Sequence, residues 1–215
     1  CPKVEPFDDD TVLAQLERLE ASGDAQIQLG LACSYLYERL GRYDKLVESM
    51  LKTTGDSAEV FKYLETLLET DGGSDGEERK EGVRKAFMQH MREFVTMDSK
   101  AAAALIVRHF GEHCVPLVKQ LSDDPQTQFN FMDALITADI AEKGSSSKSG
   151  GLPSDLHELY LSLLCEFKPA EVKLYLTRTE SYRLEYCLDL CRKHSVVDAT
   201  AYLLERMGNP AGALE

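Results

Sequence analysis

Residues 35–41 read YLYERLG, and residues 202–208 read YLLERMG. Tyrosine, leucine, glutamate, arginine and glycine recur at matched places, and a second helical pattern follows each glycine. A helix that ends in glycine and restarts at once is half of a helical hairpin. Because such a hairpin stands near both ends of the chain, we predict one building unit throughout, and stacked helical hairpins form a solenoid.

Helical periodicity extends over nearly the whole chain. Apolar residues recur at i, i+3, i+4 and i+7 in residues 60–68, 156–167 and 184–191. No stretch keeps the two-residue alternation of a strand, so we expect no sheet. The sequence therefore predicts an all-α fold, an α-solenoid of stacked antiparallel helical hairpins with about a dozen helices.

Glycines, prolines and acidic residues mark where the predicted helices begin and end. Asp98 or Ser99 is expected to cap one helix, and Pro125 stands at the start of another. The approximate helix ranges are 8–22, 25–40, 43–52, 57–69, 77–95, 98–110, 112–121, 125–142, 154–167, 169–178, 181–193 and 197–207.

A polar, low-complexity stretch, GSSSKSGG at residues 144–151, interrupts this rhythm. Its composition is typical of a mobile linker between helices. We therefore divide the chain into an N-terminal part of the solenoid at residues 1–142, a flexible Gly/Ser linker or loop insertion at 143–153, and C-terminal helices at 154–215. A last helix begins near residue 210 and stops at Glu215, so we expect the chain to be a piece of a longer protein.

The chain is acidic. It has 37 acidic and 24 basic residues among 215, which gives a net charge of −13 and disfavours nucleic acid and anionic membrane surfaces as general partners. No apolar run is long enough for a transmembrane helix, and the N-terminus has no signal-peptide pattern. The six cysteines lack the spacing of a secreted disulfide framework, which favours a reducing, cytoplasmic location.

Cys187, Cys191 and His194 resemble part of a zinc site. The two cysteines, however, share an apolar helix face, and a structural zinc site needs four ligands, usually with a tight Cys-x-x-Cys turn. Free cysteine in such a place behaves as a small apolar residue. We therefore interpret this group as core packing.

His109, His113 and Cys114 could be metal ligands or a histidine–cysteine nucleophile pair. Such catalysis also needs an orienting third group and an oxyanion site, and the sequence offers neither. We interpret the histidines as helix-end residues that face the helix dipole.

Acidic residues surround the glycine-rich turn at residues 71–76, namely Asp71, Asp75, Glu77, Glu78 and Glu81. Their order does not supply the alternating ligands of a calcium-binding loop, and the glycines match no phosphate-binding motif. We interpret them as a solvated loop followed by acidic residues at a helix N-terminus. The sequence thus contains no candidate catalytic, cofactor-binding or metal-binding residues, and we predict that the protein is not an enzyme.

The C-terminal third carries a series of phrases typical of a known repeat. YLSLLC at residues 160–165 is followed by FKPAEV at 167–172, YRLE at 182–185 and AYLLERMGN at 201–209. This order resembles the clathrin-heavy-chain-type repeat of vacuolar protein sorting subunits. The phrases YRLE and YLLE are most similar to the subunit-eight branch of that family, which belongs to the CORVET endosomal tethering complex.

The resemblance implies an α-solenoid segment of a large cytoplasmic subunit that is peripheral on endosomal membranes. It implies a non-catalytic scaffold or protein-interaction role in endosomal vesicle tethering and fusion, without a cofactor. The implied partners are other subunits of a tethering complex and an early-endosomal Rab GTPase, with no nucleic acid and no direct membrane insertion. The Gly/Ser stretch at residues 144–151 departs from the family pattern.

Two other functions are compatible with the residues. GRYD at residues 41–44 resembles the turn of a tetratricopeptide repeat, so a tetratricopeptide-like peptide-binding adaptor module is the alternative. The irregular spacing of Gly41, Gly111 and Gly208 counts against its 34-residue period. An all-helical enzyme is the third hypothesis, and loss of turnover on alanine substitution of His109 or His113 would support it.

Overall fold

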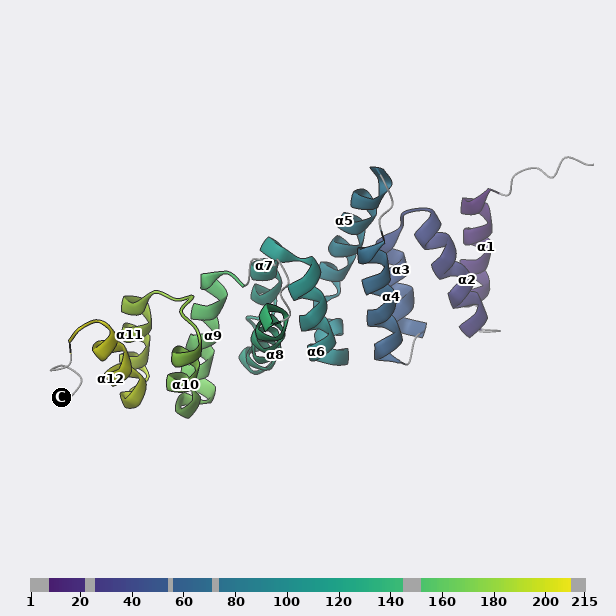
Figure 1. Ribbon diagram of the computed structural model, residues 1–215. Helices are drawn as coiled ribbons and strands as arrows, with labels where there is room; N and C mark the ends of the chain where they lie inside the picture. Colours follow the sequence, from purple (N-terminus) through teal and green to yellow (C-terminus); the bar gives the residue numbers. More distant parts are fainter. Residues whose placement is uncertain (1–7, 22–25, 54–55, 71–73, 145–151, 210–215) are drawn as a thin grey trace, which may run out of the picture. The chain divides into compact units, whose positions relative to one another are not determined.

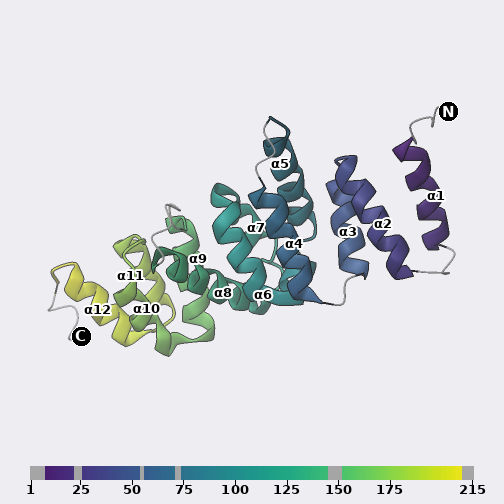
Figure 2. The ribbon, with the colours of Figure 1, turned by 45° about the vertical axis from the view of Figure 1, so that its right-hand side comes forward.

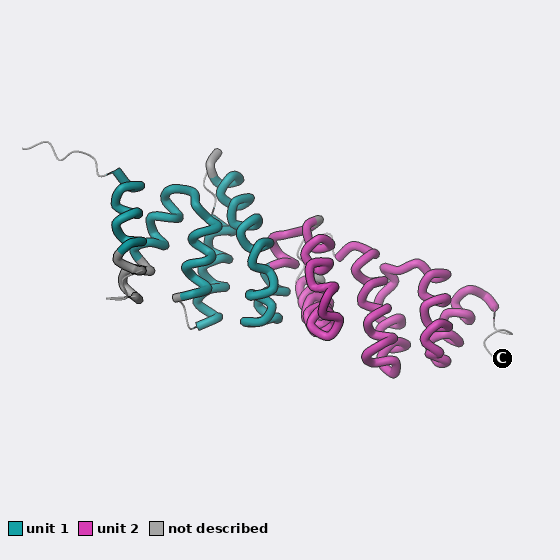
Figure 3. The backbone as a smooth tube through the Cα atoms, turned by 180° about the vertical axis from the view of Figure 1, so that it is seen from behind, with its two compact units in different colours: residues 1–105 teal, residues 106–215 magenta. Residues whose placement is uncertain are grey.

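The computed structural model describes residues 8–21, 26–53, 56–70, 74–144 and 152–209. It divides the chain into two compact units, residues 1–105 and residues 106–215 (Figure 3). Every regular element in the described residues is a helix, which confirms the all-α prediction. None of the described helices is both long and apolar enough to span a bilayer.

Unit 1 is a series of helices that pack on their neighbours (Figures 1 and 2). Arg39 at the end of the second helix lies 3.0 Å from Asp9 at the start of the first, so these two helices form an antiparallel hairpin. The helices are α1 (Asp9–Ala21), α2 (Gln26–Arg39), α3 (Tyr43–Thr53), α4 (Ser57–Glu69), α5 (Ser74–Gln89) and the first part of α6 (Met91–His109). Helix α2 packs against α1 and α3, and α5 packs against α3 and α4.

Unit 2 is also a series of helices, and their lengths range from six to 20 residues. They are the rest of α6, the 3₁₀ turn η1 (Gly111–His113), α7 (Cys114–Lys119), α8 (Pro125–Gly144), α9 (Ser154–Phe167), the 3₁₀ turn η2 (Pro169–Glu171), α10 (Val172–Arg178), α11 (Leu184–Lys193) and α12 (Val197–Arg206). Phe129 near the start of α8 stacks on Phe167 at the end of α9, with ring centroids 5.2 Å apart. Leu152, just before α9, donates its N–H to Asp139 near the end of α8, so α8 and α9 run antiparallel.

The two copies of the opening motif end their helices in the same way. Gly41 and Gly208 have φ values of +67° and +77°, the left-handed conformation that glycine adopts without strain. In the first copy the N–H of Arg42 donates to the carbonyl of Tyr37, and in the second the N–H of Asn209 donates to Leu204. Each of these hydrogen bonds joins residues five positions apart and gives a partner to a carbonyl at the helix end that would otherwise have none. The prediction of a helical hairpin turn is therefore confirmed for the first copy, where α3 follows Gly41. In the second copy the helix end is confirmed, and the helix predicted from residue 210 lies outside the described residues.

Helix α11 closes with the same hydrogen bond but without a glycine. The N–H of Val196 donates to the carbonyl of Cys191, and Ser195 takes the left-handed position with φ +57°. A residue with a Cβ atom pays a conformational penalty there. The hairpin turn is thus a repeated backbone structure that the sequence motif reveals only where glycine occupies it.

Most predicted helix bounds agree with the structure, and α4 and α9 match their predicted ranges. The prediction of a single helix over residues 77–95 is wrong, because α5 starts at Ser74 and ends at Gln89 before the chain turns helical again at Met91. Helix α11 begins at Leu184 rather than at residue 181, because Arg183 has an extended backbone (φ −85°, ψ 120°). Asp98 is non-helical inside α6 and accepts the N–H groups of residues 100 and 101, which confirms the predicted cap.

The predicted linker at residues 143–153 falls mostly outside the described residues, since residues 145–151 are not described. The flanking helices α8 and α9 belong to the same compact unit. Leu152, at the far end of that stretch, is buried. The division into residues 1–142, 143–153 and 154–215 stays a prediction.

Aromatic rings fill the core of unit 1. Phe87 and Phe94 stack with centroids 4.5 Å apart, and Phe61 lies 5.7 Å from Phe94, so α4, α5 and α6 share one cluster. Gly82 brings α5 close to α3, because a Cβ atom at this position would lie 2.4 Å from Cδ2 of Tyr43. The absence of a side chain at Gly82 therefore sets the distance between these two helices.

Candidate interaction groove

The cysteines considered as zinc ligands lie in the core of unit 2. Cys187 and Cys191 are both fully buried on α11, as predicted from their apolar helix face. Burial raises the pKa of the Cys187 thiol to about 12, so it is protonated at neutral pH. His194 follows the end of α11 and is half-buried. The prediction of core packing is confirmed for the two cysteines.

The second group, His109, His113 and Cys114, brackets the turn between α6 and α7. His109 is in the last turn of α6, which confirms its helix-end position, and His113 is exposed in η1. Cys114 is buried, and its burial raises the pKa of the thiol to about 11. A thiol that is protonated at neutral pH is a weak nucleophile.

The acidic group at the start of α5 is a solvent-facing helix surface. Glu77, Glu78 and Glu81 are exposed, and Glu77 and Glu81 lie 3.1 Å and 3.5 Å from the guanidinium of Arg84. Asp71 and the side chain of Asp75 lie outside the described residues. The predicted acidic helix N-terminus is confirmed for Glu77 and Glu78, whereas Glu81 lies in the second turn because α5 begins at Ser74.

A groove of about 350 Å³ lies between α8, α9 and α10 in unit 2. Helix α8 contributes Asp133, Ile136, Thr137 and Ile140, which lie on one face because they are spaced at i, i+3, i+4 and i+7. Ile140 is 57% exposed, an unusual fraction for a large aliphatic side chain on a helix that is otherwise well packed. We call this surface the α8–α10 groove.

The other walls of the α8–α10 groove repeat the same spacing. Helix α9 contributes His157, Tyr160 and Leu164, and the η2–α10 segment contributes Glu171, Leu174, Tyr175 and Arg178. Leu174 is 51% exposed, so each outer wall carries one aliphatic side chain that water reaches. The helices of this unit are easily followed in Figure 1 from teal-green α8 to the green α9 and α10.

Hydrogen bonds hold the floor of the α8–α10 groove in place. The hydroxyl of Tyr160 donates to Oδ1 of Asp133 at 2.6 Å, and Nδ1 of His157 lies 2.6 Å from the hydroxyl of Tyr175. The rings of Tyr160 and Tyr175 meet edge to face with centroids 4.9 Å apart. Burial raises the pKa of both tyrosines, and the Asp133 carboxylate raises that of Tyr160 further. The two phenols therefore stay neutral.

An ion pair between a buried glutamate of α9 and an exposed arginine joins α9 to the turn before α11. Glu158 is buried and accepts hydrogen bonds from Nε and Nη2 of Arg183 at 2.7 Å and 2.5 Å. Its Oε1 also accepts the backbone N–H of Arg183 at 3.2 Å. These bonds lower the pKa of Glu158, so the carboxylate is charged at neutral pH. The pair fixes the turn before α11 against α9 through a fork-to-fork geometry that lysine could not reproduce.

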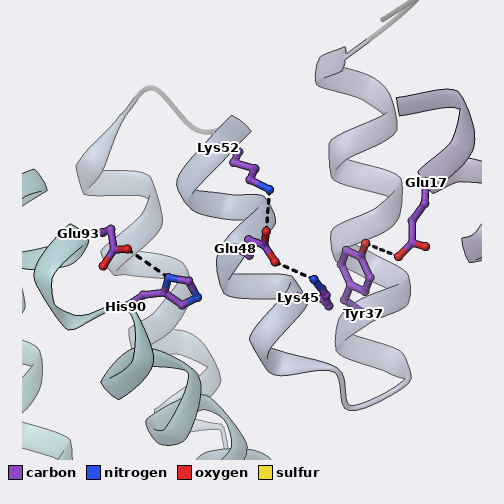
Figure 4. A network of polar contacts seen from close by, with 7 residues as sticks. All are labelled: Glu17, Tyr37, Lys45, Glu48, Lys52, His90 and Glu93. Atoms are coloured by element: carbon purple, nitrogen blue, oxygen red, sulfur yellow. Dashed lines mark hydrogen bonds and ion pairs between the residues drawn. The ribbon is translucent and has the colours of Figure 1, made fainter. Parts of the chain in front are cut away.

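Unit 1 carries its own set of surface polar contacts (Figure 4). Glu48 on α3 accepts hydrogen bonds from Lys45 at 2.9 Å and Lys52 at 2.7 Å, which lower its pKa to about 2. Tyr37 on α2 donates to Glu17 on α1 at 2.7 Å. Tyr37 is buried, whereas the pairs of Glu48 with Lys45 and Lys52 are exposed and contribute little stability individually.

The sequence did not reveal the α8–α10 groove as a site. Its residues belong to helices with ordinary periodicity, and each helix face became a groove wall only after three helices were packed together. One signal was present: α8 places two isoleucines, Ile136 and Ile140, on the same face as Asp133 and Thr137. Such a residue is informative only when the structure shows that nothing in the chain covers it.

Comparison with known proteins identifies the fold family. A family model described as the Vps41 TPR-like region matches residues 80–215. The mouse vacuolar protein sorting-associated protein 8 homolog is 32% identical over 84% of this chain and 12% of its own length. The Drosophila melanogaster homolog is 23% identical over 84% of this chain, and the mouse vacuolar protein sorting-associated protein 41 homolog is 30% identical over 46%.

The chain therefore spans about an eighth of the length of the curated relatives it matches, 12% in the mouse protein 8 homolog. No solved structure shows a significant match. The family match covers residues 80–105 of unit 1 and all of unit 2. The matched region includes the second copy of the hairpin motif and the α8–α10 groove. The chain belongs to the family of the Vps41 TPR-like region, and it is a helical-repeat segment similar to vacuolar protein sorting subunits of the protein 8 type.

Proposed function

We propose that this chain is a non-catalytic scaffold and protein-interaction segment of a vacuolar protein sorting subunit that acts in endosomal vesicle tethering and fusion. The observation that carries the proposal is the family match over residues 80–215, together with similarity to protein 8 homologs over most of the chain. Stacked helical hairpins suit this role, because each repeat contacts its neighbours and leaves long faces free for partners.

The raised pKa values of two buried cysteines and of the groove tyrosines support a role in binding. The thiols of Cys114 and Cys187 are buried, with raised pKa values, and the tyrosines of the α8–α10 groove have raised pKa values as well. Activated nucleophiles and general bases have pKa values shifted toward neutrality, and these are shifted away from it. A protein-interaction surface needs no such activation.

The proposed partners are other subunits of a CORVET-type tethering complex, with an early-endosomal Rab GTPase as a further candidate. The proposed location is the cytoplasm, with the whole protein peripheral on endosomal membranes. The net charge of −13 supports attachment through partner proteins, since an acidic segment is repelled by anionic lipid headgroups.

A replacement experiment in the full-length protein tests this proposal. Cells that lack the protein are supplied with the full-length form or with a form in which residues 80–209 are replaced by an unrelated helical repeat of the same length. We expect the replacement to be expressed at a similar level but to leave endosome clustering and sorting of vacuolar cargo defective. Full rescue of both by the replaced form would contradict a role for this segment.

A tetratricopeptide-like peptide-binding adaptor is the second candidate, and the α8–α10 groove is the observation that favours it. The groove volume is at the lower end of the roughly 300–1,000 Å³ of small-ligand sites, which fits one or two side chains of an extended segment. The two functions are compatible, because a scaffold repeat can hold a partner through a short segment.

A further inference from the structure

We propose that the α8–α10 groove binds a short segment of a partner protein in which a lysine or arginine stands next to an aliphatic residue. The inference rests on the proposed interaction function and specifies the chemistry of one partner. It follows from the distribution of charge and exposed apolar surface along the three helices that form the groove.

The charged residues of the α8–α10 groove are mostly acidic. Asp133, Asp139 and Glu171 face one basic residue, Arg178, in the lining. Asp139 is buried and already accepts the N–H of Leu152, and Glu171 lies 3.7 Å from Lys168 at the rim. Asp133 differs from both, since Tyr160 occupies its Oδ1 and no hydrogen-bond donor among the described residues reaches its Oδ2.

The Asp133 carboxylate is therefore held in place through Oδ1, and its Oδ2 can accept a hydrogen bond from a ligand. The hydrogen bond from Tyr160 holds its side chain without neutralising its charge. Asp133 is half-buried, so a cation bound there would be partly shielded from water, where charge-assisted hydrogen bonds are stronger than at a fully exposed surface. A guanidinium or ammonium group is the complement of such an oxygen.

Helix direction separates the two ends of the α8–α10 groove. Because α8 and α9 are antiparallel, Leu164 near the end of α9 lies toward the Asp133 end of α8. The η2 turn follows directly after α9, which brings Glu171 to the same end and leaves Arg178, two turns along, at the opposite end. The acidic end thus receives the cation, and Arg178 disfavours a second cation beyond it.

The aliphatic part of the partner segment is specified by Ile140 and Leu174. They line the groove from opposite outer walls, at 57% and 51% exposure, and an aliphatic side chain between them would remove all three from water. A polar segment would gain little from covering these two residues, and an acidic segment would be repelled by Asp133. A membrane surface is excluded as the occupant because anionic headgroups would meet the same carboxylates.

The test uses the full 215-residue chain and random hexapeptides displayed on phage. We expect the selected peptides to be enriched in lysine or arginine beside leucine, isoleucine or valine. The synthetic peptide SLKLSG is then compared with SLELSG by fluorescence polarisation. Binding of SLKLSG should exceed that of SLELSG by at least about tenfold, and 0.5 M NaCl should weaken it.

Substitutions in the chain test whether the peptide binds in the α8–α10 groove. Asp133→Asn keeps an acceptor for Tyr160 but removes the charge, and it should weaken SLKLSG binding about tenfold. Leu174→Ser removes an exposed aliphatic side chain of the groove and should weaken SLKLSG binding by a similar factor. Asp189→Asn, on the exposed face of α11, is the matched control and should have no effect. Unchanged melting temperatures show that each variant is folded.

Two results would overturn the inference. One is a selection without basic–aliphatic enrichment, and the other is SLKLSG binding that Asp133→Asn and Asp189→Asn leave equally unchanged. Assembly of the full-length protein with its sister subunits is measured separately for wild type and Asp133→Asn. Normal assembly of the wild-type complex together with either of these two results would contradict the groove ligand and leave the scaffold proposal in place.

Discussion

At the scale of the residue, the residue with a left-handed backbone conformation after a helix end can be tested by substitution. Gly41, Ser195 and Gly208 occupy it, with φ between +57° and +77°. The left-handed conformation costs a residue with a Cβ atom roughly 1–2 kcal/mol, and glycine avoids this cost. Glycine offsets part of that gain through its larger conformational entropy in the unfolded chain. Substitutions at these positions therefore report directly on the hairpin turn.

Ser195→Gly is expected to raise the free energy of unfolding by about 0.5–1 kcal/mol, and Gly208→Ala to lower it by about 1 kcal/mol. Steric clashes do not contribute to either value. Ser195→Gly removes atoms, and a Cβ atom at Gly208 would have no neighbour within 4 Å. Urea unfolding monitored by circular dichroism measures both. If Ser195→Gly destabilised the protein, the proposed strain at Ser195 would be wrong.

Gly82 tests the close approach of α5 to α3. In Gly82→Ala the new methyl group would lie 2.4 Å from Tyr43 Cδ2, and overpacking of this kind costs about 1–3 kcal/mol. Tyr43→Ala combined with Gly82→Ala should recover part of that loss, because the obstructing ring is gone. Additive effects in the double variant, measured by urea unfolding, would show that the two residues do not meet.

At the scale of the element, the Glu158–Arg183 pair joins α9 to the turn before α11. The pKa of Glu158 is lower in the folded chain than its usual value, so its contribution to stability is present above that usual value and is lost as pH falls through the lower, folded-state pKa. The unfolding free energy of the wild-type chain should therefore decrease from about pH 5 downward. This pair accounts for part of that slope.

Glu158→Gln should lower the unfolding free energy at pH 7 and flatten its dependence on pH below 5. The amide cannot ionise, and it leaves Arg183 without its charged partner. Urea unfolding at a series of pH values measures both effects, with Glu205→Gln on the exposed end of α12 as the control. An unaltered slope in Glu158→Gln would show that the pair does not contribute.

The elements also show what the sequence could predict. Helix type and most boundaries followed from periodicity and capping residues, as at Asp98 and Pro125, because these signals are local. The start of α11 was missed because Arg183 is held extended by Glu158, a residue 25 positions earlier. Ser195 was missed because a non-glycine residue in a glycine position has no local signal. The α8–α10 groove depends on the same long-range packing.

At the scale of the whole molecule, the proposed function depends on exposed helix surfaces. The family match places residues 80–215 in a helical-repeat region, and the α8–α10 groove lies inside it. The repeated hairpin turn explains how the chain adds helices without a central core shared by all of them. We propose that partners bind to the side chains that each helix face leaves exposed, such as Ile140 and Leu174.

The most direct test of the scaffold role is cross-linking mass spectrometry of the full-length protein purified in its native assembly. An amine-reactive reagent reports which of the exposed lysines, such as Lys62, Lys85, Lys173 and Lys193, lie near another subunit. We expect cross-links from this segment to sister subunits of a vacuolar protein sorting complex. Cross-links confined to this chain, in an assembly that is otherwise intact and cross-linked elsewhere, would contradict it.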